Sequence, residues 1–167
     1  RQVVISCTGA TASRNYMPGL TEAYYRKLPV LAITSHRGEQ AIGHLFDQQI
    51  DRRSIPNDIA VCSVTVPLVK ESADVNFCFI EATKAILALS HRGGGPAHIN
   101  MYTGYSQDFS VKELPKVRKI ERLTAFDELP VIAEGKRVAI FIGSHKPFSQ
   151  SETTCLLYTS PSPRDTR

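Results

Sequence analysis

The chain has 167 residues, of which 42% are hydrophobic and 22% are charged, and its net charge is +4. No apolar run approaches the roughly 20 residues that span a bilayer, and the first residues lack a secretory signal, so we expect a cytoplasmic protein without a membrane partner. Part of the net charge lies at the two ends of the chain, and no cluster of five or more Lys and Arg occurs. This distribution is typical of a solvated surface and argues against a nucleic-acid partner.

The first predicted unit is a strand, a turn and a helix. Residues 3–7 form a β-branched run that suits a strand buried on both faces. Residues 8–13 have small side chains and form the turn, and Ser13 or Thr11 is the expected cap of the helix. That helix has one apolar face, formed by Tyr16, Leu20, Ala23 and Tyr24. Ligands of open parallel sheets bind at such turns. The alternative is that the small residues serve tight packing alone.

Three further strands and one helix follow in alternation. Apolar runs predict strands at residues 30–34, 60–66 and 97–101. A helix is predicted over residues 74–92, with Asp74 as its N-cap and three glycines ending it. Strands that alternate with helices indicate an α/β fold, with a parallel sheet flanked by helices on both sides.

The remainder of the chain breaks this alternation. We expect residues 1–102 to form one domain, residues 103–130 to be a polar linker, and residues 131–150 to start a second α/β domain. A strand at residues 138–143 would open that second domain. Residues 151–167 change composition abruptly and contain two Ser-Pro steps, so we expect a disordered or artefactual tail there. The first two residues are suspect in the same way.

The cysteines and histidines show no metal-binding spacing. We therefore expect no metal site in this chain. Cys7, Cys62 and Cys78 lie in apolar runs, so buried free thiols are expected, with a reactive thiol at Cys7 as the alternative.

Several segments resemble a known family. The sequence TGATASRNYMPGLTEAYYRKLPVLAIT resembles the second half of the pyrimidine-binding domain of thiamine-diphosphate enzymes of the acetolactate synthase group. GGGPAHINM resembles the last strand of that domain, in the version found in the carboxylate synthases of menaquinone biosynthesis. GKRVAIFIGSH resembles the first strand of the central domain that follows. The resemblance covers about residues 3–149 and implies a partial thiamine-diphosphate-binding fold.

The resemblance also implies roles for individual residues. Gly9, Ala10 and Thr11 would form a wall against the aminopyrimidine of the cofactor, and Asn15 would orient that loop or bond to the ring. The turn is one residue longer here than in acetolactate synthases, so which of the three faces the cofactor stays open. The alternatives are tight packing for the turn and an ordinary helix-start residue for Asn15.

Arg37 and Gln48 fall where the family carries substrate-binding residues. Arg37 would hold a substrate carboxylate bidentately, and Gln48 would point into the substrate cavity. A solvated turn and a surface glutamine are the alternatives. For His98 and Asn100, on one face of the fourth predicted strand, we expect a structural pair satisfied by neighbouring backbone rather than a catalytic role.

The family uses thiamine diphosphate and Mg²⁺ to decarboxylate a 2-oxo acid and, in many members, to join the product to an acceptor. The family's catalytic Glu and its magnesium motif do not occur in this sequence. We therefore expect no catalytic residue here, magnesium bound by another domain, and an inactive fragment of a homodimeric or homotetrameric decarboxylase or carboligase. The alternative from a different class is a non-catalytic α/β binding module.

Overall fold

A computed structural model describes most of the chain, which divides into two compact units, residues 1–124 and 125–167. The described residues are 1–104, 110, 112–113, 116–118, 120–136, 139, 141–144 and 146–159, with side chains up to 156 in the last helix.

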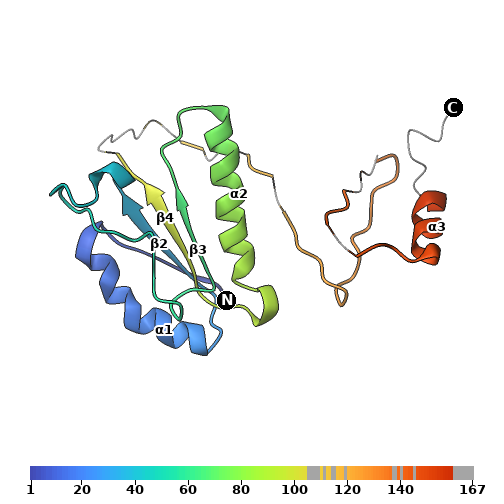
Figure 1. The fold of residues 1–167 in the computed structure, drawn as a ribbon, viewed down its shortest axis with the longest axis horizontal. Helices are drawn as coiled ribbons and strands as arrows, with labels where there is room; N and C mark the ends of the chain where they lie inside the picture. The colour runs from blue at the N-terminus through green and yellow to red at the C-terminus, as the bar shows by residue number, and fades with distance from the viewer. Residues whose placement is uncertain are drawn as a thin grey trace. The chain divides into compact units, whose positions relative to one another are not determined.

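The first unit is built on a four-stranded sheet (Figure 1). Its strands are β1 (Val3–Ser6), β2 (Val30–His36), β3 (Cys62–Val66) and β4 (Ala97–Tyr102). The order is β1-β2-β4-β3, and every neighbouring pair is parallel. The predicted α/β fold with a parallel sheet is therefore confirmed. Because all strands run the same way, their carboxyl ends meet at one edge of the sheet.

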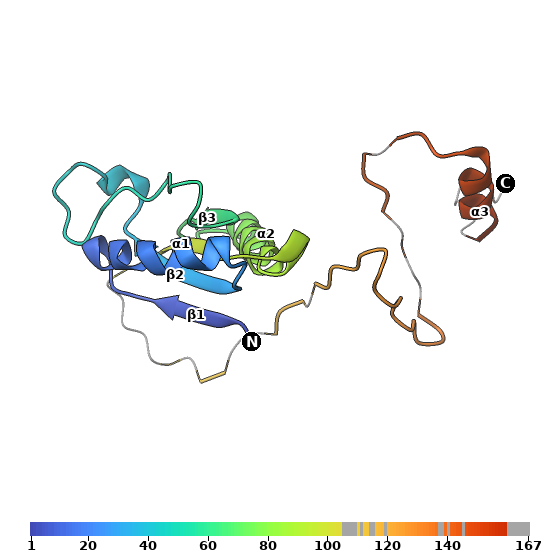
Figure 2. The ribbon, with the colours of Figure 1, turned by 90° about the horizontal axis from the view of Figure 1, so that it is seen from below.

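Helices cover both faces of this sheet (Figures 1 and 2). The helices of the first unit are α1 (Met17–Tyr25) and α2 (Ser72–Ala88), with short 3-10 turns η1 (Ala10–Tyr16), η2 (Glu39–Ala41) and η3 (His91–Gly93). Successive strand residues point to opposite faces. Leu31 of β2 packs in a cluster with Ala85 of α2, whereas the next residue, Ala32, packs with Leu20 of α1.

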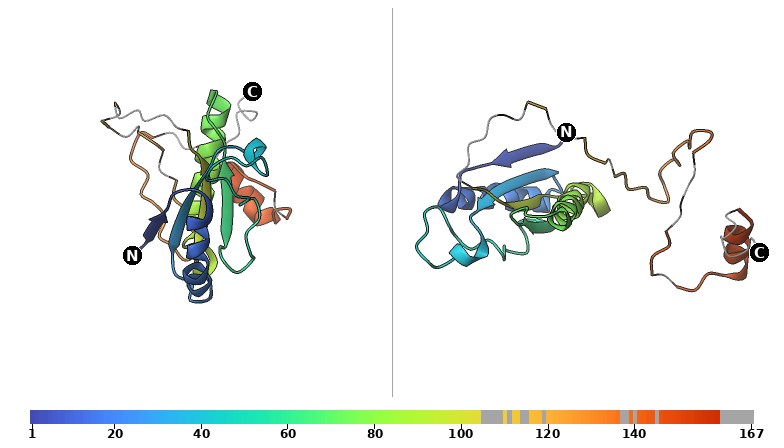
Figure 3. Two further views of the ribbon diagram at one scale, coloured as in Figure 1. Left: turned by 90° about the vertical axis from the view of Figure 1, so that its left-hand side faces the viewer. Right: turned by 90° about the horizontal axis from the view of Figure 1, so that it is seen from above.

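Strand β1 differs from its prediction. It lies at the edge of the sheet beside β2 (Figures 2 and 3) and pairs with no other described strand. Val3 and Val4 are 50% and 61% exposed. The expectation of a strand buried on both faces is wrong for β1, since an edge strand lacks the second neighbour and the covering layers of a central one.

Helix α2 begins earlier than the pattern indicated. Its N-cap is Glu71 rather than Asp74. Asp74 lies in the first turn, where its Oδ2 accepts hydrogen bonds from the backbone N–H groups of Lys70 (2.8 Å) and Glu71 (3.2 Å). A carboxylate at this position satisfies amides that the helix leaves free. The helix ends at Ala88, ahead of the predicted end at Arg92, because η3 replaces its last turn.

The second unit contains α3 (Gln150–Thr159), where disorder was expected. Ser149 and Glu152 account for its start. Glu152 Oε2 accepts from the backbone N–H of Ser149 (2.8 Å), and the Glu152 N–H donates to Ser149 Oγ (3.3 Å). This reciprocal pair is a capping box, which starts a helix. Residues 160–167 lie outside the described part of the chain. So do 138 and 140 of the expected strand, and its described residues, 139 and 141–143, are not in a strand.

The role of Asp74 leads to a first prediction. Asp74→Ala should lower the free energy of unfolding of this chain by about 1 kcal/mol, because two backbone amides lose their acceptor. Lys84→Ala in the same helix is the control. It removes an ion pair with Glu81 from a Lys84 side chain that is 60% exposed, so its effect should stay within about 0.5 kcal/mol. Equal effects in urea denaturation would contradict the assignment.

Candidate functional site

The turn after β1 contains three of the four predicted cofactor residues. Gly9 precedes η1, and Ala10 adopts a left-handed conformation with φ of 61°. No side chain caps η1, so the expectation that Ser13 or Thr11 supplies the cap is wrong. Instead the Ser13 hydroxyl donates to the Ala10 carbonyl oxygen at 2.9 Å. The turn is thus held by its own side chain, while Thr11 is exposed to solvent.

Gln48 lies directly against this turn. A Cβ atom built on Gly9 would lie 2.6 Å from the Gln48 carbonyl oxygen and 3.1 Å from the Gln48 Cβ. Such distances are too short for any side chain, so glycine is required for the loop to pack here. Gln48 itself has a φ of 57° and an exposed side chain. The structure therefore brings Gly9 and Gln48 together, as the spacing implied, and it gives Gly9 a packing role between two backbone segments.

A buried arginine connects the same segments. Arg52 is only 4% exposed. Its Nε donates to Ser13 Oγ (2.9 Å), its Nη1 to the Ser35 carbonyl oxygen (2.7 Å) and its Nη2 to the Ala10 carbonyl oxygen (3.0 Å). Burial lowers the pKa of the Arg52 guanidinium, which nevertheless keeps its charge at any ordinary pH. Sequence reasoning missed Arg52, because Asp51-Arg52-Arg53 reads as a run of surface charges.

Arg37 follows β2 at the carboxyl edge of the sheet. Its backbone N–H donates to Gln49 Oε1 (3.0 Å), and its Nη1 donates to the Thr103 carbonyl oxygen (2.8 Å). The Gln49 side chain also donates to the Gly38 carbonyl oxygen (3.5 Å). One guanidinium donor of the predicted carboxylate-binding arginine is therefore already bonded within the protein. Gln49, which the sequence analysis did not select, fixes the turn that carries Arg37.

Asn15 lies in η1 and is exposed. The six predicted site residues thus form two groups. The four predicted cofactor residues, Gly9, Ala10, Thr11 and Asn15, lie on the turn and η1. The two predicted substrate residues are Gln48, which Gly9 contacts, and Arg37, which is hydrogen-bonded to Gln49, the neighbour of Gln48 in the chain.

His98 and Asn100 are buried members of a polar chain that crosses three strands. The Thr34 hydroxyl donates to Asn100 Oδ1 (2.9 Å), so His98 Nε2 is the donor in its 2.8 Å contact with Thr34 Oγ1. His98 Nδ1 then accepts from the Ser63 hydroxyl at 2.8 Å. The expectation of a structural pair satisfied by backbone is wrong in one respect, because side chains of β2 and β3 satisfy it. Burial, with a smaller effect of the Arg52 charge, lowers the pKa of His98 to about 4.

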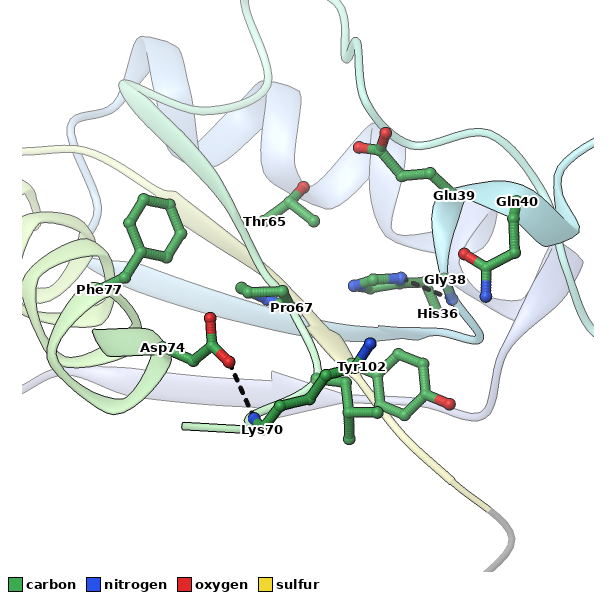
Figure 4. Close-up of a pocket in the computed structure, with 11 residues that line it drawn as sticks. His36, Gly38, Glu39, Gln40, Thr65, Pro67, Lys70, Asp74, Phe77 and Tyr102 are labelled. Carbon is green, nitrogen blue, oxygen red and sulfur yellow. Dashed lines mark hydrogen bonds between the residues drawn. The ribbon is translucent and has the colours of Figure 1, made fainter. Parts of the chain in front are cut away.

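A cavity lies at the carboxyl ends of β2, β3 and β4 (Figure 4). Its volume is about 510 Å³. Its polar lining residues are His36, Glu39, Gln40, Thr65, Lys70, Asp74 and Tyr102. None of the six predicted site residues lines it. The signal that could have found it is topological, since His36, Thr65 and Tyr102 lie at or near the carboxyl ends of three parallel strands.

His36 is the buried member of this lining, at 6% exposure. Its Nδ1 accepts from the Gly38 backbone N–H (3.0 Å), so its Nε2 carries the proton and donates to the Val66 carbonyl oxygen (3.2 Å). The ring of Tyr102 meets the His36 ring edge-on, with centroids 5.8 Å apart. His36 is therefore a fixed wall of the cavity, with both ring nitrogens bonded within the protein.

Cys7, Cys62 and Cys78 are half-buried, where full burial was expected, and all are free. Burial raises the pKa of the Cys62 and Cys78 thiols. Among the described residues, no group of three His, Cys, Asp or Glu side chains could hold a metal ion.

In that same part of the chain, no helix has the length and apolarity needed to cross a bilayer.

The contact of Gly9 with Gln48 leads to a second prediction. Gly9→Ala should lower the free energy of unfolding by about 1–3 kcal/mol, because the added methyl group must push the Gln48 backbone away. The φ of Gly9 is −56°, so the effect is steric and not conformational. Gly19→Ala in α1 is the matched control, since a Cβ there meets nothing within 4 Å. That change should be neutral or stabilising by up to about 1 kcal/mol. A neutral Gly9→Ala variant would contradict the contact.

His98 leads to a third prediction, on pH dependence. Its pKa is lowered from 6.5 to about 4 in the folded chain, so between these values the folded state binds fewer protons than the unfolded state. The free energy of unfolding should therefore fall as the pH decreases from 6.5 to 4, by up to roughly 3 kcal/mol. His98→Gln should remove this part of the slope in denaturation curves measured across that range. An unchanged slope in the variant would be the contrary result.

The chain is similar to part of several curated enzymes. It is 32% identical over 119 residues to the 2-succinyl-5-enolpyruvyl-6-hydroxy-3-cyclohexene-1-carboxylate synthase of Bacteroides thetaiotaomicron, a match that covers 71% of this chain and 21% of that protein. It is 33% identical over 119 residues to the synthase of the same name in Phocaeicola vulgatus, with the same coverage. The Geobacillus kaustophilus synthase is 30% identical over 101 residues, 60% of this chain and 18% of that protein.

No family model matches the chain. The chain spans about a fifth of the length of the curated relatives that it matches. Four relatives of the same name share 31–33% identity over 71% of the chain. Over that part, the chain is homologous to the 2-succinyl-5-enolpyruvyl-6-hydroxy-3-cyclohexene-1-carboxylate synthases, which supports its assignment as a fragment of the thiamine-diphosphate-dependent enzyme family.

Proposed function

We propose that the protein containing this chain is a thiamine-diphosphate-dependent decarboxylase or carboligase that acts on a 2-oxo acid, and that this chain supplies part of its pyrimidine-binding domain. Three observations support the proposal. The relatives are synthases of one name, the sheet is parallel, and the turn after β1 packs against Gln48. The last of these carries the proposal, because it unites the residues that the family resemblance assigns to cofactor and substrate.

The turn residues fit one side of a cofactor site in a specific way. The space beside the Gly9 Cα is taken by Gln48, so Gly9 would contribute through its backbone alone. Thr11 and Asn15 are exposed, and each offers a hydroxyl or amide group to a heteroaromatic ring. When bound, thiamine diphosphate supplies the electron sink for loss of carbon dioxide. This chain's residues would hold and orient the ring.

Magnesium would be held elsewhere in the full-length protein. The described residues contain no metal-ligating cluster, and Mg²⁺ needs oxygen ligands in near-octahedral geometry. Catalytic side chains would also come from outside this chain, which would leave the chain inactive by itself. A homodimer or homotetramer in the cytoplasm completes the proposal, since a site shared between subunits requires at least two copies.

Arg37 and Gln48 would serve the substrate. Arg37 is half-buried and gives one guanidinium donor to Thr103. A guanidinium presents five N–H donors in a planar fork whose geometry matches a carboxylate. The exposed Gln48 side chain offers one donor group and one acceptor. A 2-oxo acid carries the carboxylate and the carbonyl oxygen that these two side chains suit.

A non-catalytic α/β module is the second candidate, and one observation favours it. The glycine of the turn is required by packing against Gln48, so its presence alone does not call for a ligand. The two candidates differ in whether the full-length protein binds thiamine diphosphate. Calorimetric titration with thiamine diphosphate and Mg²⁺ separates them, because a module would show no saturable heat.

A fourth prediction tests the roles within the enzyme proposal. In the full-length protein, Gln48→Ala should lower kcat/KM for carbon dioxide release from the best 2-oxo acid of a panel by about tenfold or more. Its Kd for thiamine diphosphate should stay within about twofold of wild type, since Gln48 is assigned to substrate. Glu22→Gln is the control, because Glu22 is exposed on α1 and pairs only with Arg26 among the described residues. Unchanged kcat/KM in Gln48→Ala would remove the substrate assignment.

A further inference from the structure

Arg52 is a buried cation whose hydrogen-bond acceptors are neutral. Its three hydrogen bonds go to a hydroxyl and two backbone carbonyl oxygens. Among the described residues, no carboxylate lies within ion-pair distance of it. Burying a charge costs free energy unless hydrogen bonds compensate. Each of the three nitrogens of this guanidinium donates one hydrogen bond, and these bonds offset part of that cost.

Its neighbour Arg53 shows the contrast. Arg53 lies in solvent, where its Nη2 is 2.7 Å from Asp51 Oδ2 and its side chain is 53% exposed. The two arginines are adjacent in sequence and identical in chemistry, yet only Arg52 reaches other elements of the fold. They therefore form a matched pair for experiment.

The acceptors of Arg52 belong to two separate elements. Ala10 and Ser13 are in η1, beside the turn assigned to cofactor, and Ser35 is near the carboxyl end of β2, two residues before Arg37. Arg52 itself follows Gln48 in the same loop. Its three bonds thus join the turn, the end of β2 and the Gln48 loop at one point.

The three hydrogen bonds of Arg52 fix the distances between the turn, the Gln48 loop and the end of β2 that carries Arg37. Gly9 touches Gln48, and Arg37 is held by Gln49. Both contacts join segments that Arg52 also connects through its hydrogen bonds. A shift of Arg52 would therefore move the turn and the substrate residues relative to each other. Small displacements of this kind cost binding and rate even when no contact to ligand is lost.

We propose that Arg52 is a positioning residue, which holds the Ala10–Ser13 turn, the carboxyl end of β2 and the Gln48 loop in register without touching cofactor or substrate. The inference rests on the proposed function for its consequence in binding, and on the three hydrogen bonds for its mechanism. Lysine cannot replace this arginine, because an ammonium group lacks the planar fork that reaches three acceptors in fixed directions.

The test compares Arg52→Lys with Arg53→Lys in the full-length protein. Both variants keep the positive charge, so they separate geometry from charge. Hydrogen–deuterium exchange without cofactor is the first readout. In Arg52→Lys, peptides covering residues 8–14 and 34–38 should exchange about tenfold faster or more, because local opening becomes easier. Arg53→Lys should leave both peptides unchanged.

The second readout is the Kd for thiamine diphosphate. Arg52→Lys should weaken binding by about tenfold or more, and Arg53→Lys should stay within about twofold of wild type. Unchanged exchange in Arg52→Lys would overturn the proposal. So would faster exchange with an unchanged Kd, since the turn would then be loosened without consequence for the site.

The outcomes separate this proposal from the proposed function. If the wild-type protein binds no thiamine diphosphate, the proposed function fails, and the predicted effect of Arg52 on cofactor binding fails with it. The exchange data still show whether Arg52 holds the three segments together. Should Arg52→Lys not fold, Ser13→Ala decides, because it removes only the Nε acceptor and the Ser13 bond to Ala10. Faster exchange confined to residues 8–14 supports the positioning role of Arg52, and unchanged exchange there overturns it.

Discussion

The approach of Gly9 to Gln48 is the constraint on which the candidate site depends. No side chain fits between the two backbones, because even a methyl group on Gly9 would lie 2.6 Å from the Gln48 carbonyl oxygen. The left-handed conformations of Ala10 and Gln48, with φ of 61° and 57°, occur at this same contact. Such conformations persist where surrounding structure enforces them, and they are enriched at functional sites. Here Arg52 helps to hold the turn in this conformation, because it donates hydrogen bonds to Ala10, Ser13 and Ser35.

The parallel sheet turns this local contact into a larger arrangement. Because every neighbouring pair of strands is parallel, the turn after β1, the Arg37 turn after β2 and the cavity near His36 and Tyr102 all lie toward the carboxyl ends. The polar chain from the exposed Ser63 through the buried His98 and Thr34 to Asn100 crosses the same strands. Its hydrogen bonds satisfy the buried polar groups within the protein.

Much of the fold could be predicted from the sequence, because apolar runs and helical spacing report directly on burial. The four strands and two main helices follow from such patterns. The errors have specific causes. Composition cannot tell an edge strand from a central one, so β1 was expected to be buried. The pattern favours Asp74 as the N-cap, although a first-turn carboxylate serves the same amides. The unusual composition around Ser149 and Glu152 hides their capping box.

The site could be predicted only in part. Spacing relative to a known family placed Gly9 and Gln48 in one site, and the structure puts them in contact. The cofactor and substrate roles of the six residues stay predictions. Arg52 could not be found from sequence, since its neighbours Asp51 and Arg53 form a solvent-exposed ion pair and only the three-dimensional fold reveals that Arg52 points inward. The partners of His98 were equally hidden, because Thr34 and Ser63 become its neighbours through strand register alone.

The most direct test of the central claim is an experimental structure of the full-length protein with thiamine diphosphate and Mg²⁺ bound. The account predicts that the aminopyrimidine ring contacts the turn and η1 at Ala10, Thr11 or Asn15, with the Gln48 side chain facing the substrate side of the cofactor. A cofactor bound away from this turn, or a turn covered entirely by other parts of the protein, would contradict it.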